Sequence, residues 1–387
     1  MSGSLMFVRP RRFRHGAAMT LAVGCVLVTG VAAGSWRDEA RQPGAQTADS
    51  LVTRAEREAL AASVAEAAAE EKIDAKSAAE AVSRSGDRWS AIYTAREYEG
   101  LRQALEGRYV GVGLWVRRDA DGRIEVARAT PEGPAGRAGI TEGDRIRSID
   151  GESVDGRPVT EVVALLRGGE RAAVGTQVEL GLENGERSWR ETLRRSWLDT
   201  EDVTTERTED GALRIDVNSF SSGVGTEIRR AVRGADEEAG VLLDLRGNSG
   251  GLLQEAVAIC SVFLDGGVVA SYDVRGEERT LYAEPGGNTE LPLVVLVDGG
   301  TMSAAELLAG ALQDRGRAVV VGTRTFGKGS VQMPSELPDG SVAELTVGRY
   351  RTPEGRQVEG RGIVPEVLAE NGAEERARTV LSGLGVD

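Results

Sequence analysis

Three apolar runs in the second half of the chain end in glycine-rich stretches that carry chemically useful residues. The first is DLRGNSGG, where Gly250 and Gly251 can point backbone amides at a carbonyl oxygen. The second is GGTMSAAELLAG, in which Ser303 precedes a helical pattern, and the third is GTRTFGKGSVQ, which contains Lys328. A hydroxyl nucleophile, a basic amine and a site for an oxyanion are the groups that acyl transfer requires.

The stretch around Lys328 also resembles the phosphate-binding loop GxxxxGK[ST], in which backbone amides and a lysine hold nucleotide phosphates. That loop needs Ser or Thr directly after the lysine, whereas residue 329 is glycine. The sequence that follows, SVQMPSELPDG, contains two prolines and alternates like a strand or hairpin, so it offers no helix N-terminus for phosphate. We therefore interpret Lys328 as a residue that transfers a proton.

A lysine acts as a general base only when its neutral form is populated, so its pKa must lie well below the ordinary value. Burial lowers the pKa of a lysine, and the glycines on both sides of Lys328 allow close backbone packing. No Asp or Glu lies between Gly316 and Ser335 to hold the lysine charged. In an extended chain, residues 328 and 332 share a face, so Gln332 is predicted to orient the lysine amine or the substrate.

Scarce residue types exclude other mechanisms. The single histidine, His15, lies in a basic N-terminal stretch, which excludes a Ser/His/Asp triad and an HExxH zinc site from the folded body. Cys25 lies in the apolar N-terminal segment, and Cys260 lies in an apolar helical run where we expect it to be a buried packing residue. The net charge of -14 argues against nucleic-acid binding. No metal and no cofactor are predicted.

Simpler interpretations of two motifs stay open. Ser303 suits the N-cap of a helix, a position that serine favours. The glycines of DLRGNSGG suit a tight turn from strand to helix. If Ser303 is instead a nucleophile, the amide of Ala304 lies beside it and joins the amides of Gly250 and Gly251 as a predicted oxyanion donor.

The elements that position these residues alternate between strand and helix from about residue 189 onward. Apolar strands are predicted in LRIDVNSF, AGVLLDLRGNSGG, PLVVLVDGGT and RAVVVG, with helical patterns between them. Near-continuous apolar strands separated by helices indicate an α/β core whose sheet is covered on both faces. Binding and catalysis in such cores occur where strands end and helices begin.

Residues 109–188 have a different pattern, which predicts a small β-rich domain. Strand patterns in YVGVGLWVRR and RIEVARA precede AGITEGDRIRSIDG and a helical EVVALLRG, and this arrangement resembles a PDZ domain. PDZ domains bind an extended peptide as an added strand, and the amides of a short loop bind its terminal carboxylate. Here that loop is predicted to be Val110, Gly111, Val112 and Gly113.

The N-terminal part of the sequence predicts export. Four arginines precede an apolar stretch of 19 uncharged residues at 16–34, which ends in small residues. We therefore expect residues 1–35 to be a signal peptide or a membrane anchor, with the rest of the chain outside the cytoplasm, in the periplasm or cell envelope. Residues 36–50 are predicted to be a linker, and residues 51–108 a helical region that carries no chemistry and could serve as a dimerisation arm.

Several motifs together resemble a known family. In order along the chain, DLRGNSGGLL, SAAELLAGALQD, GTRTFGKGSVQ and YRTPEGRQVEGRGIVPE resemble the motifs of the carboxyl-terminal processing proteases, also called tail-specific proteases. The resemblance runs from about Asp87 to Glu366, and it departs at Ala305, where many relatives have serine. It implies an α/β protease core of the ClpP/crotonase-like type over residues 189–366, with an inserted PDZ domain, an N-terminal helical segment and a C-terminal tail over residues 367–387.

The resemblance also implies roles for individual residues. Ser303 takes the nucleophile position, Lys328 the general base and Gln332 the residue that supports the lysine, while Arg167 matches an arginine that couples the PDZ domain to the core. The predicted function is that of an exported serine endopeptidase acting on protein or peptide substrates with exposed C-terminal tails, and a homodimer is a possible assembly. The alternative is a catalytically silent PDZ adaptor, although such a protein is expected to have lost the serine or the lysine, and both are present.

Overall fold

A computed structural model describes residues 77–78, 82, 87–119, 121–168, 173–274 and 277–385 of the chain. The predicted signal peptide or anchor, the linker and most of the predicted helical region therefore lie outside the described residues. None of the helices in the described ranges combines the length and the apolar character that crossing a membrane requires.

The core of the body is a six-stranded sheet with the strand order β10-β11-β12-β15-β16-β19. All neighbouring pairs are parallel except β10 with β11. The strands are β10 (Val203–Arg207), β11 (Leu213–Val217), β12 (Val241–Asp244), β15 (Leu293–Val297), β16 (Val319–Gly322) and β19 (Val367–Leu368). The apolar runs that the sequence marks as strands thus form the central parallel sheet.

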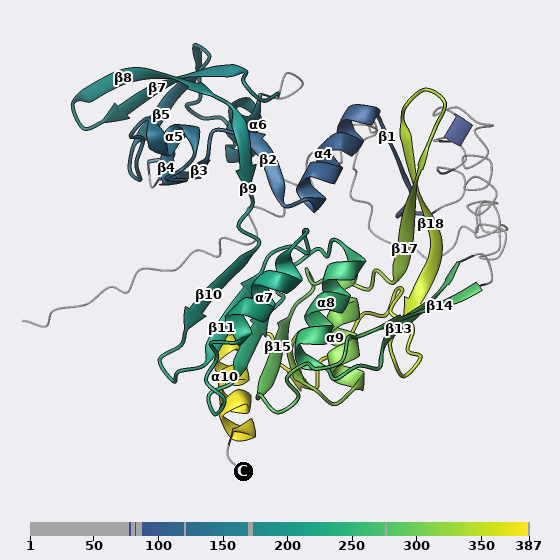
Figure 1. Ribbon diagram of the computed structural model, residues 1–387. Helices are drawn as coiled ribbons and strands as arrows, with labels where there is room; N and C mark the ends of the chain where they lie inside the picture. The colour runs from purple at the N-terminus through teal and green to yellow at the C-terminus, as the bar shows by residue number, and fades with distance from the viewer. Residues whose placement is uncertain are drawn as a thin grey trace, which may run out of the picture. The chain divides into compact units, whose positions relative to one another are not determined.

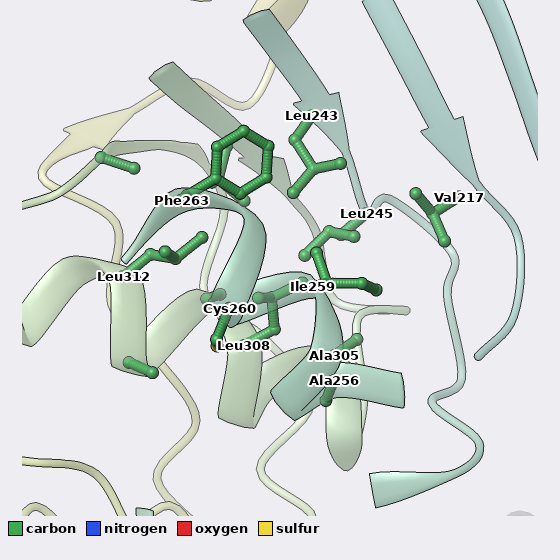
Figure 2. Packing of buried hydrophobic residues seen from close by; sticks show 14 of the residues in the cluster. Val217, Leu243, Leu245, Ala256, Ile259, Cys260, Phe263, Ala305, Leu308 and Leu312 are labelled. Carbon is green, nitrogen blue, oxygen red and sulfur yellow. The ribbon is translucent and has the colours of Figure 1, made fainter. Parts of the chain in front are cut away.

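Helices cover both faces of this sheet, because its central strands are apolar on both sides. Every residue of β12 and β15 is buried. Alternate residues, such as Leu243 and Val295, pack with the three helices α7 (Val224–Val232), α8 (Leu253–Phe263) and α9 (Ala304–Asp314). Figure 2 shows part of this cluster, including Cys260 of α8 among apolar side chains.

The opposite face of the sheet packs against the C-terminal helix α10 (Ala373–Leu384), as Figure 1 shows. Ala377 and Leu381 of this helix are 0% and 2% exposed and pack with Leu242 and Leu296. Because β19 also extends the central sheet, residues 367–385 of the predicted C-terminal tail pack as part of the core.

A second sheet of five strands carries the hairpin that the sequence predicts after Lys328. The hairpin consists of β17 and β18, and β18 also pairs with β1 and β13. The strands are β1 (Ala91–Tyr93), β13 (Val268–Val274), β14 (Glu277–Tyr282), β17 (Ser330–Glu336) and β18 (Val342–Arg351). Since β1 precedes the PDZ-like unit in the chain and β18 follows it, that unit is an insertion in the core.

The inserted unit has its own hydrophobic core and a sheet with the strand order β3-β4-β5-β7-β8, with β6 paired to β5. Its strands are β3 (Leu114–Arg118), β4 (Ile124–Ala129), β5 (Arg145–Ile149), β6 (Glu152–Ser153), β7 (Gln177–Asn184) and β8 (Arg187–Arg194). Its helices are α5 (Pro134–Arg137) and α6 (Val159–Arg167). Strand β8 pairs with β7 along its whole length, so the sheet continues past residue 188.

A two-stranded ribbon forms where the chain enters and leaves the inserted unit. Strand β2 (Arg108–Gly111) pairs antiparallel with β9 (Ser196–Asp199). Helix α4 (Ala95–Leu105) precedes β2 and begins with a capping box, in which the Thr94 side chain accepts from the amide of Glu97 and the Glu97 carboxylate accepts from the amide of Thr94.

Candidate active site

The candidate residues lie at neighbouring strand ends. Strands β12, β15 and β16 are adjacent and parallel, so their carboxyl ends meet at one edge of the sheet. The loop after β12 carries Gly250 and Gly251, the loop after β15 leads to Ser303, and the loop after β16 leads to Lys328. The fold therefore brings the three motifs to one edge.

Ser303 has an unusual backbone conformation. It occupies the N-cap position of α9 with φ 55° and ψ -121°, and it is one of only two non-glycine residues with positive φ in the described part of the chain. An ordinary N-cap residue is extended. A non-glycine residue in this region costs about 1–3 kcal/mol, and such strain is concentrated at functional sites. Nucleophilic serines at sharp turns from strand to helix are held in this way.

Lys328 is largely shielded from water. Its amine lies 5.0 Å from the centre of the Trp89 ring, and burial lowers the pKa of Lys328 below the ordinary value. Although no carboxylate is near in the sequence, four come close in space and oppose this shift by favouring the charged amine: Glu344, Glu359, Asp87 and Glu306, in decreasing order. The net direction is downward, as proton transfer by a lysine requires.

Trp89 was not predicted to contribute to the site, because the region 51–108 was expected to carry no chemistry. Its indole nitrogen donates to Glu359 Oε1 at 3.0 Å, and its ring meets the Phe326 ring edge-on with centroids 5.8 Å apart. Glu359 in turn accepts from the amide of Gly329 at 2.9 Å. These contacts fix the aromatic ring beside the lysine amine, so the segment before the inserted unit forms part of the lysine environment.

Gln332 does not meet Lys328 in the predicted way. Its side-chain nitrogen donates to Ser330 Oγ at 2.8 Å and to Thr346 Oγ1 at 3.2 Å. A β-bulge between Val331 and Gln332 interrupts the regular alternation on which the prediction relied. Among the described residues no hydrogen bond joins Gln332 to Lys328, and its supporting role stays a proposal.

The glycine pair lies directly beside the serine. A Cβ atom added to Gly250, whose φ is 96°, would lie 3.0 Å from Ser303 Cβ and 3.1 Å from the amide nitrogen of Ala304. The amide of Gly250 itself donates to Asn248 Oδ1 at 2.8 Å, so it is already engaged. The close approach explains why glycine is needed at 250, but the bond to Asn248 argues against Gly250 as an oxyanion donor.

Gly251 and Ala304 fit the oxyanion role better. Gly251 lies opposite Phe220 in a parallel bridge. The two hydrogen bonds of this bridge join Phe220 to the carbonyl of Gly250 and to the amide of Leu252, so the N–H of Gly251 itself points away from Phe220. Ala304 is the first residue of α9, where the N–H groups have no partner within the helix. The positive end of the helix dipole at this position also favours a negative charge.

Asn248 fixes the turn that holds these amides, and it was missed from the sequence. Asn248 is fully buried, and its side-chain nitrogen donates to the carbonyl of Val217 at 2.9 Å. Its backbone carbonyl accepts from the amide of Met302 at 2.9 Å. The residue thus joins the ends of three neighbouring strands. An asparagine inside a glycine-rich turn after a buried strand was the available signal.

Two further residues that the sequence interpretation missed connect Ser303 to Lys328. The Glu306 carboxylate accepts from the backbone amides of both residues, and the Tyr350 hydroxyl donates to both of their carbonyls. The pattern Ser-x-x-Glu at a helix start, a capping box, could have revealed Glu306. Tyr350 had no comparable local signal, because it comes from β18.

The predicted carboxylate loop of the inserted unit precedes β3, the edge strand of its sheet. Val110 and Gly111 end β2, while Val112 is buried and Gly113 has φ 76°. An unpaired edge beside a glycine-containing loop suits the addition of a peptide strand. Arg167, at the end of α6, lies with its guanidinium 5.3 Å from the centre of the Tyr109 ring in β2.

The described residues contain no cluster of three or more His, Cys, Asp or Glu side chains that could hold a metal ion. Cys260 is fully buried and free, and burial raises the pKa of its thiol far above the ordinary value, so its predicted packing role is confirmed.

The only lysine after residue 76 is Lys328, in a chain with 47 Lys and Arg residues in total. Every other cationic side chain after residue 76 is arginine, which cannot release its proton at neutral pH. A single lysine among arginines was therefore a second sequence signal for a general base.

The comparisons with known proteins define the class of this chain. Residues 212–369 match the model of peptidase family S41, and residues 125–179 match that of a PDZ domain. Residues 212–369 therefore belong to peptidase family S41, and residues 125–179 belong to a PDZ domain. The resemblance and the α/β core with an inserted PDZ domain that the motifs predicted are confirmed.

Its curated relatives are processing proteases. The carboxy-terminal processing protease CtpA of Bacillus subtilis is 33% identical over 289 residues, covering 73% of this chain and 61% of that protein. The chloroplastic carboxyl-terminal-processing peptidase 3 of Arabidopsis thaliana is 33% identical over 307 residues, covering 74% and 58% respectively. The chain thus spans less than two thirds of the length of either relative. The solved structure of a photosystem II D1 C-terminal processing protease aligns with 84% of this chain and 97% of its own, at 26% identity and a TM-score of 0.49.

Proposed function

We propose that the protein is a serine endopeptidase in which Ser303 is the nucleophile and Lys328 is the general base. The observation that carries this proposal is the combination of a strained serine at a helix start with a lysine whose pKa is lowered by burial, at one edge of the sheet. Backbone strain at Ser303 and a lowered pKa at Lys328 are two independent features that a merely structural turn does not need.

The proposed reaction is acyl transfer to the serine and then to water. The neutral amine of Lys328 takes the proton of the Ser303 hydroxyl as its oxygen attacks the scissile carbonyl, and the amides of Gly251 and Ala304 stabilise the oxyanion. As the tetrahedral intermediate collapses, the peptide C–N bond breaks and the lysine ammonium gives its proton to the leaving amine. Water then attacks the ester carbonyl as the neutral lysine takes one of its protons, and the ester C–O bond breaks as the lysine ammonium returns that proton to the Ser303 oxygen.

We further propose that the PDZ domain selects substrates by their C-terminal tails. The edge strand β3 offers unpaired backbone groups to an extended peptide, and the loop with Val112 and Gly113 offers amides to its carboxylate. The relatives named as carboxy-terminal processing proteases support this assignment. The basic and apolar N-terminal sequence supports action outside the cytoplasm, with export by a signal peptide or an anchor.

The test uses the full chain and an unstructured polypeptide that ends in a free apolar tail. New termini are identified by mass spectrometry for the wild type and for Ser303→Ala, Lys328→Ala and Lys328→Arg, with Ser188→Ala, at an exposed serine of β8, as a matched serine control. We expect Ser303→Ala and both lysine variants to lose at least about 10³-fold in kcat, and Ser188→Ala to keep it. Equal inertness of all forms on every tail would instead identify a PDZ adaptor without protease activity.

A substrate with the same chain and an amidated C-terminus tests the PDZ domain separately. The proposal predicts a raised KM with little change in kcat, because the carboxylate contact is made equally in the ground and transition states. An unchanged KM would show that the tail carboxylate does not contribute to recognition.

A further inference from the structure

The Glu306 carboxylate is a fully buried acceptor at the start of α9. It is 0% exposed, and it accepts four hydrogen bonds. The donors are the amide of Ser303 at 2.9 Å, Thr325 Oγ1 at 2.5 Å, the amide of Gly327 at 2.7 Å and the amide of Lys328 at 2.8 Å. One side chain therefore joins the residue before the helix to the loop that carries the lysine.

These four contacts favour an ionised carboxylate. A carboxylate offers lone pairs on both oxygens and no proton, whereas a glutamine side chain would direct an N–H at two of the donors. Burial raises the pKa of Glu306, and the bonds from Thr325, Gly327, Lys328 and Ser303 oppose that shift. No cation forms an ion pair with it among the described residues, so backbone and hydroxyl dipoles stabilise the charge.

The Tyr350 hydroxyl makes the complementary connection. It donates to the carbonyl of Ser303 at 2.9 Å and to the carbonyl of Lys328 at 3.1 Å, so one proton is shared between two acceptors. The ring is 2% exposed, and the backbone amide of Tyr350 donates to the carbonyl of Gly329 at 2.8 Å. The tyrosine is thus fixed at both its backbone and its hydroxyl.

We propose that Glu306 and Tyr350 form a backbone clamp that sets the distance between Ser303 and Lys328, and this proposal rests on the proposed serine and lysine mechanism. Glu306 holds the N–H groups of the two residues, and Tyr350 holds their carbonyls. Such a clamp is needed because Ser303 and Lys328 lie 25 positions apart in the chain, in separate segments. Proton transfer needs the reacting atoms within hydrogen-bond reach, and a displacement of about 1 Å can cost about 10²-fold in rate.

Helix capping alone does not explain this arrangement. A capping box accounts for the bond from the Ser303 amide to Glu306, and it would be complete without the loop. Gly327 and Lys328 lie 21 and 22 residues after Glu306 in the chain, and their hydrogen bonds to the Glu306 carboxylate do not cap the helix. Because neither Glu306 nor Tyr350 is assigned to the reacting atoms, both are positioning residues.

The decisive variant is Tyr350→Phe, which removes one hydroxyl and keeps the ring in the core. The matched control is Tyr272→Phe, because Tyr272 is the direct cross-strand partner of Tyr350 and its hydroxyl has no hydrogen bond in the described part of the structure. Both are made in the full chain, together with Glu306→Gln and the conservative Glu306→Asp. For each, kcat and KM are measured on the unstructured polypeptide, and folding is checked by thermal unfolding.

We expect Tyr350→Phe to lower kcat by about 10-fold to 100-fold with KM within twofold, and Tyr272→Phe to leave both unchanged. Glu306→Gln is expected to lower kcat further, with partial recovery in Glu306→Asp. A Tyr350→Phe variant with wild-type kcat would overturn the clamp, and so would a loss confined to KM. If Glu306→Gln does not fold, Tyr350→Phe alone decides.

The failure of the clamp can be separated from the failure of the proposed function. If Ser303→Ala is inactive while Tyr350→Phe keeps full kcat, the mechanism stands and the clamp is wrong. If Ser303→Ala keeps activity, the proposed mechanism fails and the clamp fails with it.

Discussion

The strained backbone at Ser303 leads to a stability prediction that does not depend on any substrate. Replacing Ser303 with alanine or with glycine removes the same hydroxyl, but only glycine adopts φ 55° and ψ -121° at low cost. The two variants should both be inactive, and they should differ in stability. The glycine variant is expected to be the more stable, although glycine normally destabilises a fold.

The magnitude follows from three effects. Relief of the backbone strain contributes about 1–3 kcal/mol, and glycine also exceeds alanine as an N-cap by several tenths of a kcal/mol or more. The greater freedom of glycine in the unfolded chain opposes this by about 0.4–1 kcal/mol. We therefore expect Ser303→Gly to be about 1–2 kcal/mol more stable than Ser303→Ala. For a domain of this size, that corresponds to a Tm higher by about 2–8 °C.

Calorimetry of the full chain measures this difference, and Thr94 provides the matched control. Thr94 is the N-cap of α4 with an ordinary φ of -61°, so Thr94→Gly and Thr94→Ala differ by the cap and entropy effects without the strain. The glycine advantage should be larger at Ser303 than at Thr94. Equal differences at the two positions would refute strain at the serine.

Three other variants test the surroundings of the two proposed catalytic residues. Trp89→Ala exposes the Lys328 amine to water and so weakens the burial that lowers its pKa, and the rise of kcat/KM with pH should therefore move to higher pH. Glu344→Gln removes the carboxylate that most favours the charged amine, so the same rise should move to lower pH. Gly250→Ala places a methyl group 3.0 Å from Ser303 Cβ at a φ of 96° and should lower kcat by about 10²-fold in a folded protein.

Controls and contrary outcomes are specific to each variant. Trp197→Ala, at an exposed tryptophan of β9, should not move the pH profile, and a shift in the same direction for Trp89→Ala and Glu344→Gln would contradict the electrostatic argument. Gly247→Ala is the control for Gly250→Ala, because Gly247 also has positive φ but nothing lies within 4 Å of an added Cβ. Equal losses in these two glycine variants would mean that backbone strain, and not contact with Ser303, is responsible.

The fold could be predicted because its signals are local, and the two proposed catalytic residues were selected from local signals too. Fully apolar strands such as Leu293–Val297 mark a buried parallel sheet, and glycines at the strand ends mark the turns. Ser303 and Lys328 stood out because the body of the chain has no histidine to act as a base. The packing of residues 367–385 on the core was not predicted, since a short strand and a helix of ordinary composition give no sign that their apolar residues cover a sheet face.

The support around these residues could not be predicted, because it comes from distant segments. Trp89 and Glu359 reach Lys328 from parts of the chain separated by 270 positions. The expected pairing of Gln332 with Lys328 assumed a regular strand, and the β-bulge at Val331 changes the direction of the side chains. The spacing of residues along the chain does not reveal such contacts. The segments that make them come together only when the strands pair into sheets.

The most direct test of a neutral lysine at the site is a titration of Lys328 itself by NMR, in the full chain labelled only at lysine. The sequence has just two other lysines, Lys72 and Lys76, so few signals are expected, and Lys328→Arg assigns the third. We predict a pKa for Lys328 clearly below that of an ordinary lysine, rising in Trp89→Ala. A Lys328 signal that titrates at the ordinary value, unchanged in Trp89→Ala, would contradict its role as the general base.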